Sequence, residues 1–345
     1  LKYQYENLET LSYVPKWQEA QLQYMVEQLP CRIFIESEDP DGLCGVDIDK
    51  MQSANMARTK VTKPYRDAID NLHQWTIAAI PSREWAHKVF PDEDIDTAYE
   101  KLWEEIFKTV HISHDNDPIK EWELHGENLI RKSQKLNSFN FDYLHYQCDN
   151  GTDFTCKLIP NSKWAGGGDY LADGTFFNPN MPTEEIFISP MKGKCEGTLV
   201  ATMPLSYMGN LIENFSITFK DGKAVSCKAE KNEELLIKML QMDEGASMLG
   251  ELALVPYDSP ISNSGILFYN TLFDENAACH VAMGHGFDST IEGFEKLSKD
   301  EIKAMGVNDS LIHVDFMIGC EKLNITGYTA DNEAVEIFKN GNWAF

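Results

Sequence analysis

The chain has few positive charges and lacks long apolar runs. Its 345 residues include 30 Lys and Arg against 55 Asp and Glu, which gives a formal net charge of -25. A surface this acidic repels phosphate backbones, which argues against nucleic acid as a partner. No apolar run approaches the ~20 residues that a membrane-spanning helix needs. Composition therefore predicts a soluble protein that binds neither nucleic acid nor membrane.

The eight cysteines lack the spacing of a metal-binding or redox motif. None lies in a CxxC pair, which argues against a zinc ribbon or a thioredoxin-like site. A chain of this length does not need disulfides for stability, so we expect reduced thiols. Residues 1–5 have no basic region that leads into an apolar segment, unlike a signal peptide. These absences together predict a cytoplasmic protein.

The first part of the chain alternates between helix and strand patterns. Apolar residues recur at helical spacing in several segments, and the short apolar runs between them are typical of buried strands. Strands separated by helices predict a parallel or mixed sheet. We expect Pro64 to break the second helix. The expected helices cover residues 16–29, 51–73, 95–110 and 118–136, and the expected strands cover residues 31–35 and 75–80.

The pattern changes after Ser138, where short β runs separated by Gly, Asn and Asp replace helical spacing. Asp221-Gly222 lies between two of these runs and is a strong hairpin signal. We therefore predict an α/β N-terminal domain over residues 1–140 and an α+β, β-rich domain over residues 141–345. The expected strands cover residues 143–148, 153–159, 198–203, 215–219, 224–228 and 311–318, with more between 323 and 345, and one helix is expected over residues 232–242.

Two fragments of the second domain carry acidic residues within apolar runs. His313 and Asp315 are two residues apart, so on a strand both would project to the same face. An ionised carboxylate on a buried strand is costly unless it is paired, and either a cation or a mutual hydrogen bond would offset that cost. Glu251 lies in the small apolar run Gly250–Pro256, where an ionised Glu is rarely buried alone.

Two further fragments are weaker when each is taken singly. Glu275 precedes His280 by five residues, and a single His in such a place is more often structural than a ligand. Glu184 and Glu185 follow Pro182, and an exposed acidic turn explains them more simply. Together the four fragments offer two imidazoles and several carboxylates, a donor set that suits Zn, Mn or Co. Carboxylates beyond the needs of one ion point to two metals that share a ligand.

Longer motifs occur in order along essentially the whole chain. These motifs are Asn180–Glu185, Gly250–Pro256, Asp258–Ser262, Leu267–Asn276, His313–Gly319 and Asn340–Ala344. Together they resemble the aminopeptidase T / aminopeptidase S family of dinuclear metallo-aminopeptidases, with weaker similarity in the first half, as at Trp85–Phe90.

The resemblance implies a homodimeric, two-domain enzyme that removes N-terminal residues from peptides with a free N-terminus. Its β-rich metal-binding catalytic domain would hold two divalent metal ions, which could be Zn, Co, Mn or Mg. Glu184 is the near alternative to Glu185 as a ligand, and Glu184 or Glu275 would carry the proton to the leaving amine. Carried over motif by motif, the metal ligands are Glu185, Glu251, Glu275, His280, His313 and Asp315.

The chain departs from the family pattern at one catalytic position. Family sequences usually have a tyrosine seven residues after the equivalent of His280, where this chain has Phe287. A phenol could hydrogen-bond the developing oxyanion and a phenyl ring cannot, and losing one such donor typically costs about 2.7–4 kcal/mol. His285 could supply a donor instead. We also expect the chain to begin inside the family's N-terminal domain.

Two alternatives to an active aminopeptidase remain open. One is a metal-binding relative with weak or no peptidase activity, because of Phe287. The other is a carbohydrate-acting domain with Glu185 and Glu251 as its acid/base pair, which leaves the imidazoles unexplained. The remaining histidines of the first half are dispersed, and we expect no special role for His73, His87, His111, His114 or His125.

Overall fold

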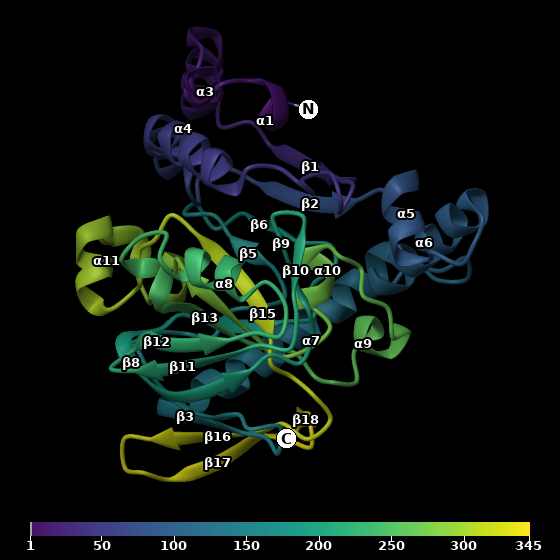
Figure 1. Cartoon of the computed structure of the whole chain (residues 1–345). Helices are drawn as coiled ribbons and strands as arrows, with labels where there is room; N and C mark the ends of the chain where they lie inside the picture. Colours follow the sequence, from purple (N-terminus) through teal and green to yellow (C-terminus); the bar gives the residue numbers. More distant parts are fainter. Residues whose placement is uncertain (1) are drawn as a thin grey trace.

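In the computed structural model, which describes residues 2–345, helices lie above and beside a large antiparallel sheet and a smaller one (Figure 1). The large sheet has the strand order β12-β11-β8-β4-β3-β16-β17-β18. Its strands are β3 (Phe141–Gln147), β4 (Asp153–Leu158), β8 (Pro190–Val200), β11 (Ser216–Lys220), β12 (Lys223–Lys228), β16 (Asn324–Thr329), β17 (Ala334–Lys339) and β18 (Asn342–Trp343).

The smaller antiparallel sheet has the order β15-β14-β13-β7, and every residue of its two central strands is buried. Burial on both faces requires small or apolar side chains nearly throughout, which matches the runs Leu249–Leu254 and His280–Gly284. Any charged residue in these strands therefore needs a partner. The strands are β7 (Ile186–Ile188), β13 (Leu249–Leu254), β14 (His280–Gly284) and β15 (His313–Met317), and two separate hairpins are β5 (Asp169–Tyr170) with β6 (Phe176–Phe177) and β9 (Leu205–Tyr207) with β10 (Asn210–Ile212).

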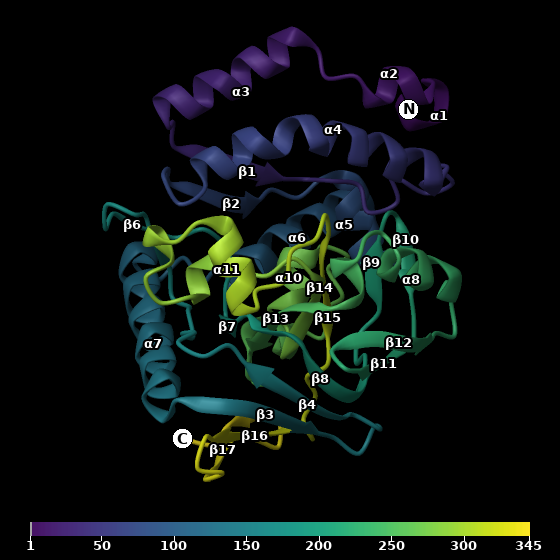
Figure 2. The same cartoon turned by 90° about the vertical axis from the view of Figure 1, so that its left-hand side faces the viewer.

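The N-terminal part contains a two-stranded parallel sheet, with helices α3 (Lys16–Gln28) and α4 (Ile48–Ile69) above it (Figure 2). The parallel pairing of β1 (Arg32–Glu36) with β2 (Trp75–Ala79) agrees with the alternation of helix and strand in the sequence. On its other side β2 pairs through Ile77 with Asn180, so the chain just before β7 is bonded to this sheet.

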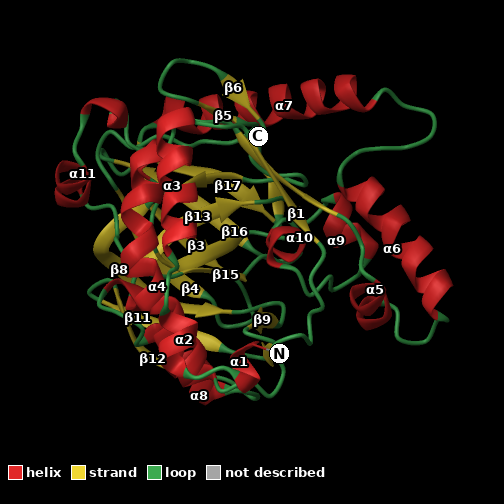
Figure 3. Cartoon of the chain, turned by 90° about the horizontal axis from the view of Figure 1, so that it is seen from above, coloured by secondary structure: helices red, strands yellow, loops and turns green. Residues whose placement is uncertain are grey.

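Seen from above, helices α3 and α4 lie over the strands, while α5, α6 and α9 gather to one side (Figure 3). Among residues 2–345, none of the helices combines the length and the apolar character needed to cross a membrane. The helices are α1 (Lys2–Tyr5), α2 (Leu8–Ser12), α3 (Lys16–Gln28), α4 (Ile48–Ile69), α5 (Arg83–Val89), α6 (Ile95–Thr109), α7 (Pro118–Phe139), α8 (Glu233–Leu240), α9 (Pro260–Ser264), α10 (Thr271–Glu275) and α11 (Lys299–Met305).

The prediction that Pro64 breaks the second helix is wrong. Helix α4 continues through Pro64 to Ile69. An internal proline removes one helical hydrogen bond and costs about 3 kcal/mol. Residues on both sides of the proline are buried, namely Met51 and Ala54 before it and Ile69 after it. Their packing offsets the local cost, which spacing along the sequence alone does not reveal.

The expectation that all cysteines are reduced is also wrong for one pair. Cys156 of β4 lies directly opposite Cys195 of β8 in the sheet register, and the two are joined by a disulfide with Cα atoms 4.3 Å apart. The two residues are 39 positions apart in the chain, so their spacing in the sequence gives no sign of the pairing. The strand register brings them together.

Two apolar cores connect distant parts of the chain. The larger core lies between the sheets and α7, which contributes Leu129 and Leu136. The second core joins helices α5 and α6 to the segment 261–277. In it Trp85 packs edge-on against Phe273, with ring centroids 5.7 Å apart. The first part of the chain therefore helps to position the segment that ends in α10.

Gly284 is the position at which the small sheet depends most directly on backbone geometry. Its φ is +103°, and a Cβ atom there would collide with the carbonyl oxygen of Ile312, the residue just before the neighbouring strand β15. We expect Gly284→Ala to lower the free energy of unfolding by about 3 kcal/mol or more, because β14 and β15 must separate. At Gly174, where φ is +87° and a Cβ meets nothing within 4 Å, Ala should cost only about 1 kcal/mol.

Urea denaturation of both glycine variants beside the unmodified protein measures the difference. Equal destabilisation of Gly284→Ala and Gly174→Ala would show that the close contact across the sheet is unimportant.

Candidate metal centre

The small sheet brings four of the proposed ligands to one face. In its register, Ala282 of β14 lies opposite Glu251 of β13 on one side and opposite Asp315 of β15 on the other. Residues opposite one another project to the same face, and so do residues two apart on a strand. His280 and His313 therefore share this face with the two carboxylates.

Two more carboxylates reach the same place from outside these strands. Glu185 immediately precedes β7, and its Oε2 lies 3.1 Å from Nε2 of His280. Glu275 is the last residue of α10, and its carboxylate, an Asp315 oxygen and a His280 nitrogen lie within 4.8 Å of one another. The structure thus brings together all six residues expected to bind metal: Glu185, Glu251, Glu275, His280, His313 and Asp315.

His313 forms a second group that overlaps the first. Its Nε2 lies 3.2 Å from Oε2 of Glu251 and 3.4 Å from Oδ1 of Asp315. Each of these carboxylates also belongs to a group with His280 whose ligand atoms lie within 4.8 Å of one another. Glu251 and Asp315 therefore face both imidazoles, as a pair of ions with shared ligands requires.

The outward nitrogens of both imidazoles are fixed by backbone carbonyls. Nδ1 of His280 lies 3.1 Å from the oxygen of Ala278, and Nδ1 of His313 lies 2.7 Å from the oxygen of His285. A carbonyl can only accept, so Nδ1 donates and Nε2 is directed at the carboxylates, as in most metal-binding histidines. Nε2 of His280 and Oδ1 of Asp315 are buried, and although each lies close to a group of opposite charge, neither makes a well-aligned hydrogen bond. A divalent cation would satisfy both atoms, so these residues fit a metal centre.

The electrostatics of the cluster lead to the same conclusion. Burial raises the pKa of Glu251 to about 7, and burial together with the Asp315 charge raises the pKa of Glu275. Burial opposes protonation of His280, yet the adjacent Glu185 carboxylate raises its pKa to about 10. Without a cation, the cluster can balance its negative charge only by retaining protons. Divalent ions would replace those protons.

A cavity of about 440 Å³ opens over the cluster, and both parts of the chain line it. Trp75 and Ile77 of β2 form one wall, which places apolar side chains of the first part opposite the metal-binding face. The lining residues are Asp70, Asn71, Trp75, Ile77, Ala165, Gly166, Gly167, Gly168, Asp169, Pro179, Asn180, Thr183, Glu185, Phe187, Glu251, Glu275, His285, Gly286, Phe287, Asp288, Ser289, His313 and Asp315.

Phe287 lies in this cavity, against one of the proposed ligands. Its ring centroid is 4.9 Å from that of His313 and 5.1 Å from that of Phe187. His285 also lines the cavity, and burial lowers the pKa of its imidazole. Both residues considered from the sequence as donor positions therefore lie beside the cluster.

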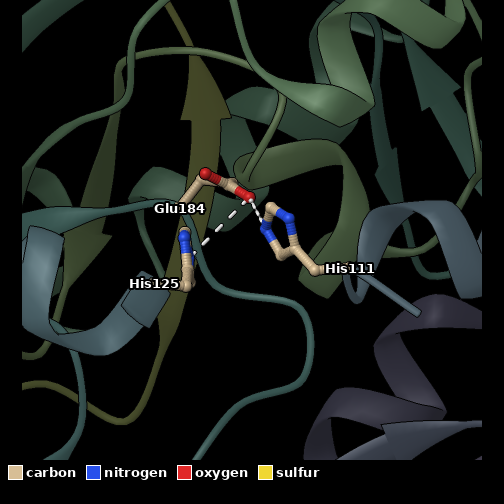
Figure 4. Close-up of side chains that lie close together, drawn as sticks. All are labelled: His111, His125 and Glu184. Atoms are coloured by element: carbon tan, nitrogen blue, oxygen red, sulfur yellow. Dashed lines mark hydrogen bonds and ion pairs between the residues drawn. The ribbon is translucent and has the colours of Figure 1, made fainter. Parts of the chain in front are cut away.

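Glu184 is oriented differently from its neighbour Glu185, since it does not line the cavity. Its Oε1 lies 2.7 Å from Nε2 of His111 and 3.9 Å from Nε2 of His125 (Figure 4). The hydrogen bond with Glu184 raises the pKa of His111, whereas burial lowers that of His125. Sequence reasoning gave these histidines no role, because nothing in their spacing connects them with residue 184.

Known proteins resemble this chain over its whole length. The family described as thermophilic metalloprotease (M29) matches residues 1–343. Aminopeptidase AmpS of Bacillus subtilis is 44% identical over 346 residues, which cover 100% of this chain and 84% of that protein. Aminopeptidase 2 of Geobacillus stearothermophilus is 42% identical, with 100% of this chain and 83% of that protein covered.

A solved structure is also similar to this chain over its whole length. Wild-type AmpT from Thermus thermophilus superimposes with a TM-score of 0.89 at 36% identity, covering 100% of this chain and 84% of that chain. The resemblance inferred from the sequence motifs is thereby confirmed. With a family match over nearly every residue and relatives of this similarity, the chain belongs to the thermophilic metalloprotease (M29) family.

Proposed function

We propose that the protein is a metal-dependent aminopeptidase that hydrolyses N-terminal residues from peptides. The observation that carries the proposal is the convergence of four carboxylates and two imidazoles in one cluster, of which all but His280 line a single cavity. The names of the similar proteins support the same reaction, since AmpS, aminopeptidase 2 and the Thermus aminopeptidases T are all described as aminopeptidases.

The six clustered residues would hold two divalent ions. One ion would lie near His280 and Glu185, and the other near His313. Glu251 and Asp315 are the best candidates for shared ligands, because each lies close to both imidazoles. Imidazole ligands favour Zn, Co or Mn over Mg, although all four are compatible with the carboxylates.

Once bound, two such ions would lower the pKa of a water molecule towards neutrality and polarise the scissile carbonyl. Glu275 lines the cavity and lies beside His280 and Asp315, so we assign to it the transfer of the proton to the leaving amine. Glu184 is the less suitable candidate, because its carboxylate faces His111 outside the cavity. The acidic cavity wall, which includes Asp169, would attract the protonated N-terminus of a peptide.

The two alternative functions are less well supported. The hypothesis of a metal-binding relative without peptidase activity has no support from the named relatives, because all of them are described as aminopeptidases. A glycosidase acid/base pair of Glu185 and Glu251 would leave the buried His280 and the half-buried His313 without a purpose. Zinc as the natural metal, a homodimer and a cytoplasmic location remain part of the proposal and depend on the family resemblance.

Metal removal tests the proposal directly. Exhaustive chelation should abolish release of p-nitroaniline from leucine p-nitroanilide, because the cluster loses the cations that complete it. Addition of Zn²⁺, Co²⁺ or Mn²⁺ to the chelated protein should restore the activity. Activity that survives chelation, or that no metal restores, would contradict the proposal.

Replacing a proposed shared ligand should greatly reduce peptidase activity. We expect Glu251→Gln to lower kcat/KM about a thousandfold, or about 4 kcal/mol, because an amide cannot neutralise two cations as a carboxylate does. Glu104→Gln makes the same chemical change on the exposed face of α6 and should leave kcat/KM unchanged. Steady-state kinetics of the two variants gives the comparison, and similar rates for both would remove Glu251 from the centre.

Restoring the family's phenol should increase the rate. Phe287→Tyr adds a hydrogen-bond donor beside His313, and we expect kcat to rise about 100-fold, with a smaller change in KM. Phe187→Tyr adds the same hydroxyl to the neighbouring phenylalanine of the cavity and serves as the control. If both variants hydrolyse leucine p-nitroanilide no faster than the unmodified protein, residue 287 does not stabilise the transition state.

A further inference from the structure

A second cluster of metal-binding side chains lies next to the main centre but outside its cavity. It consists of His111, His125 and Glu184, here called the outer triad (Figure 4). One potential ligand atom from each residue lies within 4.8 Å of the others. Both Nε2 atoms approach the same carboxylate oxygen, at 2.7 Å for His111 and 3.9 Å for His125. Three segments distant in sequence thus converge on one point.

The outer triad is built into the fold and is not a chance surface contact. The side chains of His111, His125 and Glu184 are only 27%, 11% and 9% exposed. The two imidazole rings lie 4.3 Å apart, and the edge of Trp122 packs against both. This packing restricts both rings to positions in which their nitrogens face Glu184.

The backbone around His111 is held in an uncommon conformation. His111 has a φ of 55°, in the left-handed region that residues other than glycine seldom adopt. The side chain of Asn116 donates to the carbonyl oxygen of His111, and the indole nitrogen of Trp122 donates to that of Val110. Such conformations persist where the surroundings impose them, often at binding sites.

We propose that the outer triad binds a divalent transition-metal ion such as Zn²⁺. Two imidazoles and one carboxylate form a donor set that suits Zn²⁺ or Co²⁺ and is poorly suited to Mg²⁺ or Ca²⁺, which prefer oxygen ligands. Nε2 of His125 donates to the carbonyl oxygen of Thr183 at 2.7 Å, and an ion bound by this nitrogen would take the place of its proton.

An ion in the outer triad would stabilise the segment that carries a main ligand. Glu184 is adjacent to Glu185, and the backbone N–H of Glu184 donates to Oδ1 of the buried Asn276 at 2.7 Å. Asn276 follows Glu275 and donates through Nδ2 to the oxygen of Leu272 at 2.8 Å. A metal on Glu184 would therefore restrain both chain segments that supply ligands from outside the small sheet. This structural role does not depend on the proposed peptidase reaction.

Metal stoichiometry tests the outer triad separately from catalysis. Chelated protein is dialysed against buffered Zn²⁺, and bound zinc per chain is measured by inductively coupled plasma mass spectrometry. We expect His111→Ala and His125→Ala each to bind one equivalent fewer than the unmodified protein. His114→Ala replaces a nearby exposed histidine outside the triad and should lose none. A large excess of Mg²⁺ should not displace the zinc held by the triad.

A variant of the main centre separates the two sites. His280→Ala/His313→Ala should lose the zinc of the main centre and retain one equivalent, which a further His111→Ala change should remove. In the His280→Ala/His313→Ala protein, the remaining equivalent of Zn²⁺ should also raise the Tm, and the further His111→Ala change should abolish that increase. Circular dichroism identifies any variant that fails to fold, and Glu184→Gln then replaces it.

Two results would overturn the proposal. One is an equal zinc content in folded His111→Ala and His114→Ala proteins. The other is a main-centre variant that binds no zinc while the unmodified protein binds it. If the unmodified protein binds zinc at the outer triad but shows no peptidase activity, that result would instead count against the proposed function alone.

Discussion

The mutual repulsion of four carboxylates within one buried cluster is the constraint on which the site depends. Glu185, Glu251, Glu275 and Asp315 lie within a few ångströms of two imidazoles, and burial makes each isolated negative charge costly. Bound protons reduce this cost, as the raised pKa values of Glu251 and Glu275 indicate. A protonated carboxyl group, however, has fewer oxygen lone pairs free to bind a metal ion. Divalent cations remove the repulsion and leave the oxygen atoms in place. The fold around the cluster must therefore hold these groups together against their electrostatic repulsion.

The surrounding structure achieves this through strand register and through contacts with the N-terminal part. Ala282 keeps the space between Glu251 and Asp315 free of a large side chain. The carbonyls of Ala278 and His285 fix the two imidazoles from behind. Pairing of β2 with Asn180 attaches the loop before Glu185 to the N-terminal sheet, and the same strand supplies one wall of the cavity. The first part of the chain therefore contributes to the site although it carries none of the main ligands.

Local patterns in the sequence indicated some residues of the candidate site, but the full set of six ligands came only from the family resemblance and stays a prediction. A His and an Asp two apart in an apolar strand, and a Glu inside a buried run, required partners wherever they were placed. The hairpin at Asp221-Gly222 was predicted from its turn residues and is found between β11 and β12. Long-range packing could not be predicted in this way. It carries α4 through Pro64, pairs Cys156 with Cys195, and brings His111 and His125 to Glu184. The division into domains at residue 140 stays a prediction, with α7 contributing to the larger core.

The central claim is that the clustered carboxylates and imidazoles bind a pair of metal ions. Anomalous diffraction at the zinc edge, from crystals grown with Zn²⁺, measures this most directly. Within the main cluster the account predicts two anomalous peaks about 3.5–4 Å apart, as in two-metal sites generally, with Glu251 and Asp315 in contact with both. A single peak, or none among these residues while zinc binds elsewhere, would contradict it.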